Sequence, residues 1–272
     1  MSTLAAADRA RCAELAIVPG RPFDLALRFI GAPAADRALA LEALFSILRE
    51  LPWNVSDPAP GLAQLAWWQA EIAQAGKHGS QHPVVRALLA TGAVSTLRGP
   101  VWMDYVQRLG EDLVDNVIPD RHALLDRLRD TAGREAVLVS GLDQPGAWCS
   151  SIAARCLALL ARVDSTGQAP AWVPLELVAR YSRADNPTAL VAGLAELALE
   201  WSAESPPGSA RLPDSARLVL LQSLLARRLL QQLHDRPKSA LGRGADRVGT
   251  MDVFRAWRWA RRWPALVTME QT

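Results

Sequence analysis

The sequence has few of the residues that build disulfide frameworks, β-sheets or membrane spans. Its three cysteines are an odd number without CxxC spacing, so neither a disulfide framework nor a zinc site is expected. Phe (four) and Tyr (two) are scarce, and alternating polar and apolar runs are rare, which argues against strands. No apolar run reaches about 18 residues without a charge, so a membrane-spanning helix is not expected.

An excess of one charge is also lacking. The 30 Lys and Arg residues face 28 Asp and Glu residues, for a net charge of +2, which excludes a chain-wide polyanion-binding surface but allows a local basic patch. A signal peptide would need an apolar run near the N-terminus. Four charged residues stand there instead: Asp8, Arg9, Arg11 and Glu14. A reduced, cytoplasmic protein is therefore expected.

What the sequence does contain is helical periodicity. Half of the residues are hydrophobic, and they recur at steps of three and four among the helix formers Ala, Leu, Arg and Glu. One such stripe covers roughly residues 35–51, and Pro52 followed by Pro58 and Pro60 is expected to close its helix. Further helices are expected at about 61–75, from Pro83, and at 100–116, 121–140, 147–163, 187–202, 214–234 and 250–263. The sequence predicts an all-α protein of about eight to ten helices, in one domain over residues 1–272.

Four short segments form the most specific pattern in the chain. They are LAWWQAEI at 65–72, His82-Pro83-Val84, GEDLVDNVIPDRHALLDRLRDTAG at 110–133 and AWVPLELVARYS at 171–182. Their order and spacing resemble the squalene and phytoene synthases, in which a Trp-Trp helix precedes a His-Pro-Val helix start. The resemblance covers most of the chain. It implies the isoprenoid synthase fold, a single domain in which helices surround one central cavity.

In that family, chemistry rests on two Asp-xxx-Asp motifs. Their i, i+4 spacing places two carboxylates on one helix face, and two facing pairs hold the Mg²⁺ ions that bind the diphosphate leaving group. This sequence lacks both motifs. The first should fall at 50–55, where the chain reads Glu50-Leu51-Pro52-Trp53-Asn54-Val55, and the second at Ala161 and Ser165. The sequence therefore predicts a degenerate site with no cofactor, and Mg²⁺ only if the protein is an active enzyme.

Other acidic residues are candidates for an unusual metal site. Glu111 and Asp115 are four residues apart, with Asp112 between them, and Glu50 follows Arg49 in an Arg-Glu-Leu string found in several members of the family. For the acids at 111–115, a solvated face or a buried ion pair is the favoured interpretation. For Arg49, a salt bridge with a later helix and a role in the cavity stay open.

Three aromatic residues are candidates for lining the cavity: Phe45, Trp67 and Trp68. The alternative for large aromatics on helices is core packing, and neighbouring helix positions cannot both point inward. His82, which precedes a proline, is expected to start a helix. No second His or Cys stands at metal-ligand spacing to it.

The C-terminal region is locally basic. Between Arg236 and Arg262 there are eight basic and two acidic residues. Tryptophans interleave with arginines in its last part: Arg255, Trp257, Arg258, Trp259, Arg261, Arg262 and Trp263. This pattern is typical of a segment that lies at a membrane surface and contacts lipid phosphates. The alternative is a closing helix with Trp257 inside and the arginines in water. Nucleic-acid binding is the weaker third interpretation, because no known module surrounds the patch.

Two functional hypotheses follow. The first is a non-catalytic family member, peripheral to the inner membrane, that binds an isoprenoid or another lipid or serves as an assembly partner. The Arg-Glu-Leu string and the Trp-Trp helix are similar to the branch that contains the mitochondrial complex I assembly factor. The second is an active prenyltransferase that joins isoprenyl diphosphates head to head, with Mg²⁺ held by Glu50, Glu111, Asp112 and Asp115. It requires carboxylates of two helices to converge within about 6–8 Å.

Overall fold

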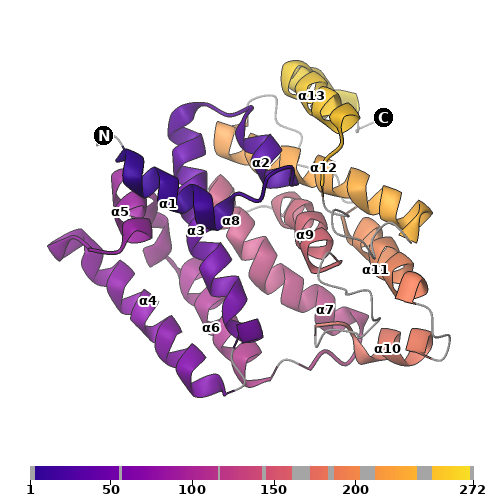
Figure 1. Cartoon of the computed structure of the whole chain (residues 1–272), viewed down its shortest axis with the longest axis horizontal. Helices are drawn as coiled ribbons and strands as arrows, with labels where there is room; N and C mark the ends of the chain where they lie inside the picture. The colour runs from indigo at the N-terminus through magenta and orange to yellow at the C-terminus, as the bar shows by residue number, and fades with distance from the viewer. Residues whose placement is uncertain are drawn as a thin grey trace. The chain divides into compact units, whose positions relative to one another are not determined.

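Figure 1 shows a computed structural model of the chain. The structure describes residues 4–54, 57–115, 117–142, 145–160, 172–182, 187–202, 212–237 and 247–269. All regular secondary structure in these ranges is helical, as predicted. The chain folds as two compact units, unit 1 with Met1–Val18 and Ile30–Asn116, and unit 2 with Pro19–Phe29 and Val117–Thr272. A single domain around one cavity stays a prediction.

Unit 1 is built around the long helix α3. Its elements are α1 (Ala6–Ala16), α3 (Ala32–Asn54), α4 (Pro58–His78), α5 (Pro83–Ala90), the 3₁₀ helix η1 (Ala93–Arg98) and α6 (Pro100–Val114). Helix α3 contacts all the others. The predicted apolar stripe of α3 is buried, with Leu41, Leu44, Phe45 and Leu48 fully shielded from solvent. The helical period of these residues therefore sets the packing of unit 1.

The junction between α3 and α4 corrects one prediction. Pro52 does not end α3, which continues to Asn54. Pro52 cannot donate to the Leu48 carbonyl and its ring crowds that carbonyl, so only two more residues of α3 follow it. Helix α4 begins at Pro58, before the expected start, because proline is favoured in the first turn and the Asp57 side chain accepts a 3.0 Å hydrogen bond from the Ala59 amide.

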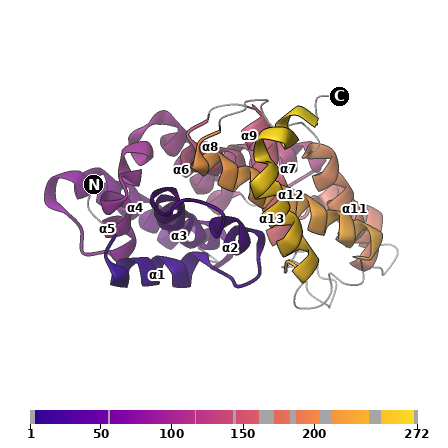
Figure 2. The same cartoon turned by 90° about the horizontal axis from the view of Figure 1, so that it is seen from above.

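Unit 2 is built around helix α12. Its elements are α2 (Pro22–Leu27), α7 (Arg121–Leu128), the π-helical turn η2 (Arg129–Gly133), α8 (Arg134–Ser140), α9 (Pro145–Leu160), α10 (Leu175–Ser182), α11 (Pro187–Trp201), α12 (Asp214–Asp235) and α13 (Thr250–Met269). Helix α12 contacts α2, α8, α9, α11 and α13. The core lies between α9, α11 and α12, where Ile152, Val191 and Leu230 are fully buried. Figure 2 shows α13 lying across α12.

The sequence underestimates the number of helices. It gives about eight to ten, whereas the described ranges belong to thirteen α-helices. The elements that it misses are α1, α2, η1 and α10. Helices α2 and α10 have six and eight residues, too few for a clear period. Helix α1 buries Asp8, Cys12 and Ala16, so its inner face carries no apolar stripe.

Candidate functional site

The carboxyl-terminal half of α3 is where the first acidic motif of the family should lie. Arg49 binds Glu42 two turns earlier on the same helix, with Nη2 and Oε2 3.0 Å apart. The side chains of Arg49 and Glu42 are only 19% and 14% exposed. The Arg49 guanidinium also lies 5.8 Å from the centre of the Phe45 ring. Arg49 therefore forms a salt bridge within α3. The next residue, Glu50, is half-buried.

Phe45 is part of an aromatic cluster in the core of unit 1. Its ring meets Tyr105 of α6 edge to face at 5.5 Å, and Tyr105 lies 5.8 Å from Trp102. Phe45 and Tyr105 have no exposed surface, and Trp102 is 2% exposed. Because neighbouring side chains cover all of Phe45, its place in the structure is that of a core residue joining α3 to α6.

Two acids in the last turns of α6, Glu111 and Asp112, contact one arginine. Arg108 Nη1 lies 3.3 Å from Glu111 Oε2, and its Nε lies 3.2 Å from Asp112 Oδ1. Asp112 is 8% exposed, while Glu111 is exposed and also accepts a 3.1 Å hydrogen bond from Gln107. Asp115 is exposed just after the end of α6, and its amide donates to the Glu111 carbonyl. Asp112 thus has the environment of the buried ion pair that the sequence favours.

The donor set of the described ranges does not fit a magnesium cluster. Mg²⁺ binds through several oxygen ligands at once. Within the part of the chain that the structure describes, no three His, Cys, Asp or Glu side chains stand close enough together to hold a metal ion. Ala161 and Ser165, at the second motif, lie outside the described residues.

Helix α9 leads toward the second motif position and carries a charge pair that sequence reasoning missed. Arg155 Nη2 lies 3.9 Å from Glu135 Oε1 on α8, with side chains 18% and 8% exposed. The two residues are twenty positions apart, on different helices, so no spacing pattern indicates the contact. The pair places charge inside unit 2 beside the π-helical turn, a type of distortion frequent at functional sites.

The Trp-Trp pair of α4 is divided between core and surface. Trp68 is 2% exposed and Trp67 is 47% exposed, because adjacent helix positions point in different directions. His82 is the N-cap of α5, as predicted, and its ring lies 4.8 Å from the Trp68 ring and 5.9 Å from the Trp67 ring. Burial lowers the pKa of His82. These three rings join α4 to the start of α5.

Comparison with known proteins finds one matching family model and a similar solved structure. The squalene/phytoene synthase family model matches residues 19–142. The fold is similar to the crystal structure of a dehydrosqualene synthase in complex with ligand, with a TM-score of 0.66 and 16% identity over 94% of this chain and 96% of that chain. Residues 19–142 thus match the squalene/phytoene synthase family, and the chain shares the fold of that dehydrosqualene synthase structure. A search of curated proteins finds no match.

The family match confirms the resemblance and the isoprenoid synthase fold. The residues at which the family match begins and ends bear on the two motif positions. The matched range includes α3, where the sequence predicts the first acidic motif position, and ends at residue 142, before α9. The second motif position therefore falls in the part of the chain that only the structural likeness relates to the family. Membership in the branch of the complex I assembly factor stays a prediction.

The arginines and tryptophans of the C-terminal pattern lie on α13. Arg255 is half-buried and contacts Asp252 at 3.1 Å. Trp257 is 40% exposed, Arg258 is exposed and Trp259 is half-buried. The side chains of Arg261, Arg262 and Trp263 lie outside the described residues. Across the described ranges, no helix combines the length and the apolar character needed to cross a bilayer.

Proposed function

We propose that this chain is a member of the squalene/phytoene synthase family that binds an isoprenoid or another lipid without catalysing prenyl transfer. One observation carries the proposal. At the end of α3, where the family places its first pair of metal-binding carboxylates, this chain has the Arg49–Glu42 pair followed by Glu50 and Pro52. The cation of Arg49 neutralises the carboxylate on its own helix, so the helix end offers no pair of acids to Mg²⁺.

The chemistry of the family explains why this replacement matters. Departure of diphosphate requires divalent metal to stabilise the developing negative charge. A single carboxylate provides too few ligands to bind several Mg²⁺ ions. The acids of α6 do not compensate, because Arg108 lies against both Glu111 and Asp112. The second motif position carries Ala161 and Ser165 in place of acids. A member of this family without either acid pair keeps the scaffold and loses the means to activate the leaving group.

The ligand class follows from the scaffold. The similar dehydrosqualene synthase structure contains a ligand, and helical scaffolds bind small molecules in mainly apolar cavities. We infer that an apolar, isoprenoid-like molecule is the ligand here. The proposal also includes action as an assembly partner, peripheral to the inner membrane, as in the branch that the Arg-Glu-Leu string resembles.

Native mass spectrometry of the full chain, purified gently from its host, tests the ligand. We expect a mass excess of a few hundred daltons that extraction with organic solvent removes, and we expect it to be the same in Mg²⁺ and in excess EDTA, since no metal bridges ligand and protein. A chain that is free of any lipid and is recovered only with a protein partner would contradict lipid binding. A ligand lost on adding EDTA would contradict the metal-free mode.

A further inference from the structure

The first part of helix α13, residues 251–257, presents several large apolar side chains to solvent. Met251 is 66% exposed, Phe254 is 51% exposed and Trp257 is 40% exposed, with Val253 at 42% beside them. The side of the helix that packs inward carries a carboxylate and a small residue, Asp252 at 4% exposed and Ala256 at 0%. A helix whose packing was set by its own unit alone would have the opposite arrangement. Exposed apolar patches of this kind mark interaction surfaces.

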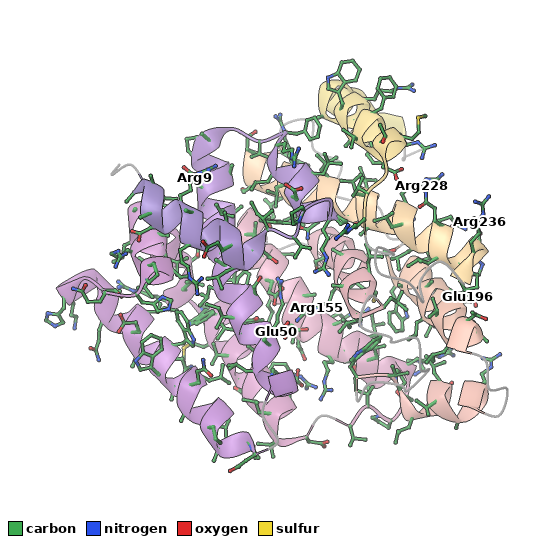
Figure 3. The ribbon with its side chains drawn as sticks, in the orientation of Figure 1. Arg9, Glu50, Arg155, Glu196, Arg228 and Arg236 are labelled. Atoms are coloured by element: carbon green, nitrogen blue, oxygen red, sulfur yellow. The ribbon has the colours of Figure 1, made fainter. Side chains whose placement is uncertain are left out.

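The orientation of α13 is fixed by polar contacts within unit 2. Asp252 Oδ1 lies 3.1 Å from Arg255 and 4.0 Å from Arg228 of α12, which Figure 3 labels. The other carboxylate oxygen of Asp252 accepts a 3.3 Å hydrogen bond from the Gly249 amide at the start of the helix. The preceding residue, Val248, donates to the Gly20 carbonyl at 2.6 Å. These contacts hold Met251, Phe254 and Trp257 outward.

The surroundings of this face are basic. The Arg258 guanidinium lies 6.0 Å from the centre of the Phe254 ring, and the Phe254 and Trp257 rings stack at 5.5 Å. Arg247, just before α13, is exposed. Arg28 is 65% exposed and pairs with Asp24; it directly follows α2, a helix that contacts α13. In the described parts of α2 and α13 the acids are Asp24 and Asp252, both buried and both bound to arginine.

We propose that the outer face of α13, formed by Met251, Phe254, Trp257 and Arg258, docks on the surface of an anionic bilayer. Aromatic and sulfur-containing side chains would enter the headgroup region, and arginines would meet lipid phosphates, the combination by which interfacial helices bind. The basic surroundings favour this partner over an apolar protein groove. The inference does not depend on the proposed isoprenoid ligand, but it deepens the proposed position at the inner membrane and rests on that part of the proposal.

The structure also divides the residues that the sequence suggested for this contact. Trp257 and Arg258 belong to the docking face. Arg255 and Trp259 are half-buried, and Arg255 contacts Asp252, so their first role is to hold the helix. The docking face therefore begins at Met251 and includes Phe254, which the interleaved Trp and Arg pattern did not indicate.

Co-sedimentation of the full chain with vesicles tests the proposal. We expect binding to vesicles of phosphatidylcholine with phosphatidylglycerol at low salt, weak binding to phosphatidylcholine alone, and release as salt rises. The triple variant Met251→Ser, Phe254→Ser and Trp257→Ser should bind more than about tenfold more weakly. Arg258→Gln should bind about fivefold more weakly, with a smaller salt dependence. Leu175→Ser, which changes a 55% exposed side chain on α10 of the same unit, should bind like the unmodified protein.

Four results would overturn the proposal. They are an unmodified protein that ignores anionic vesicles at low salt, a folded triple variant that binds them fully, a Leu175→Ser control that loses as much binding, and light scattering that shows a dimer which the triple variant abolishes. The dimer would assign the face to a second copy of the chain. Circular dichroism checks folding of each variant, and the single variant Phe254→Ser should show a smaller loss in the same direction.

Discussion

Replacing Phe45 by alanine should lower the free energy of unfolding by about 3–5 kcal/mol. Phe45 has no exposed surface and meets Tyr105 edge to face across the α3–α6 contact. The variant loses the buried ring and leaves a cavity among side chains that cannot fully collapse. Urea denaturation followed by circular dichroism measures the change. Leu62→Ala, at a 39% exposed position on α4 of the same unit, is the matched control and should change stability little.

The same experiment separates packing from ligand binding at Phe45. A residue that lines an open cavity is supported on one side only, so its truncation would cost much less in stability while it weakened ligand retention. If Phe45→Ala unfolds like the unmodified protein but loses a bound lipid, the core assignment is wrong. Phe45 then lines the cavity, as the family resemblance first suggested.

Replacing Arg108 by alanine should lower the free energy of unfolding by about 2 kcal/mol. Asp112 is 8% exposed and has Arg108 within 3.2 Å. Removing one member of a buried ion pair costs more than the pair contributes, because the other charge stays buried. We place the value below the full cost of a buried pair because the Arg108 side chain is 26% exposed. Thermal and urea unfolding measure it. Glu111→Gln, at an exposed partner of the same arginine, should have a small effect.

Addition of Mg²⁺ gives the complementary result. If Asp112 pairs with Arg108 and holds no metal, millimolar Mg²⁺ leaves the unfolding temperature unchanged. A ligand that binds only the folded state would raise it. A rise with Mg²⁺ that Asp112→Asn abolishes would contradict our account of α6 and would favour a metal site built from its acids.

Long helices with a strong apolar period are what the sequence predicts best. The predicted helix over 121–140 is confirmed as α7, η2 and α8 in unbroken succession. The π-helical turn inside it leaves no trace in the period of the apolar residues. Helix α1 is missed because a polar contact holds it. Asp8 is 6% exposed and is bound by Arg86 of α5, and a buried pair between distant residues has no sequence signature.

Some features of the candidate site can also be predicted from the sequence, and others cannot. The absence of both acid pairs is a prediction from the sequence, because their expected positions follow from the order of the family motifs. The four-residue spacing of Arg108 and Asp112 also indicates a local pair. The Arg49–Glu42 contact is less visible, since it spans seven residues. The steps of three and four that join Leu65, Trp68 and Ile72 would have identified Trp68 as the inward residue of the Trp-Trp pair.

An assay of diphosphate release tests the central claim most directly. The full chain is incubated with farnesyl or geranylgeranyl diphosphate and Mg²⁺, and diphosphate, squalene and phytoene are measured. We predict no product above the background without protein, and the same for the variant Ala161→Asp with Ser165→Asp, because the acid pair of α3 would still be absent. Clear turnover by the unmodified chain would contradict the account and identify an active prenyltransferase.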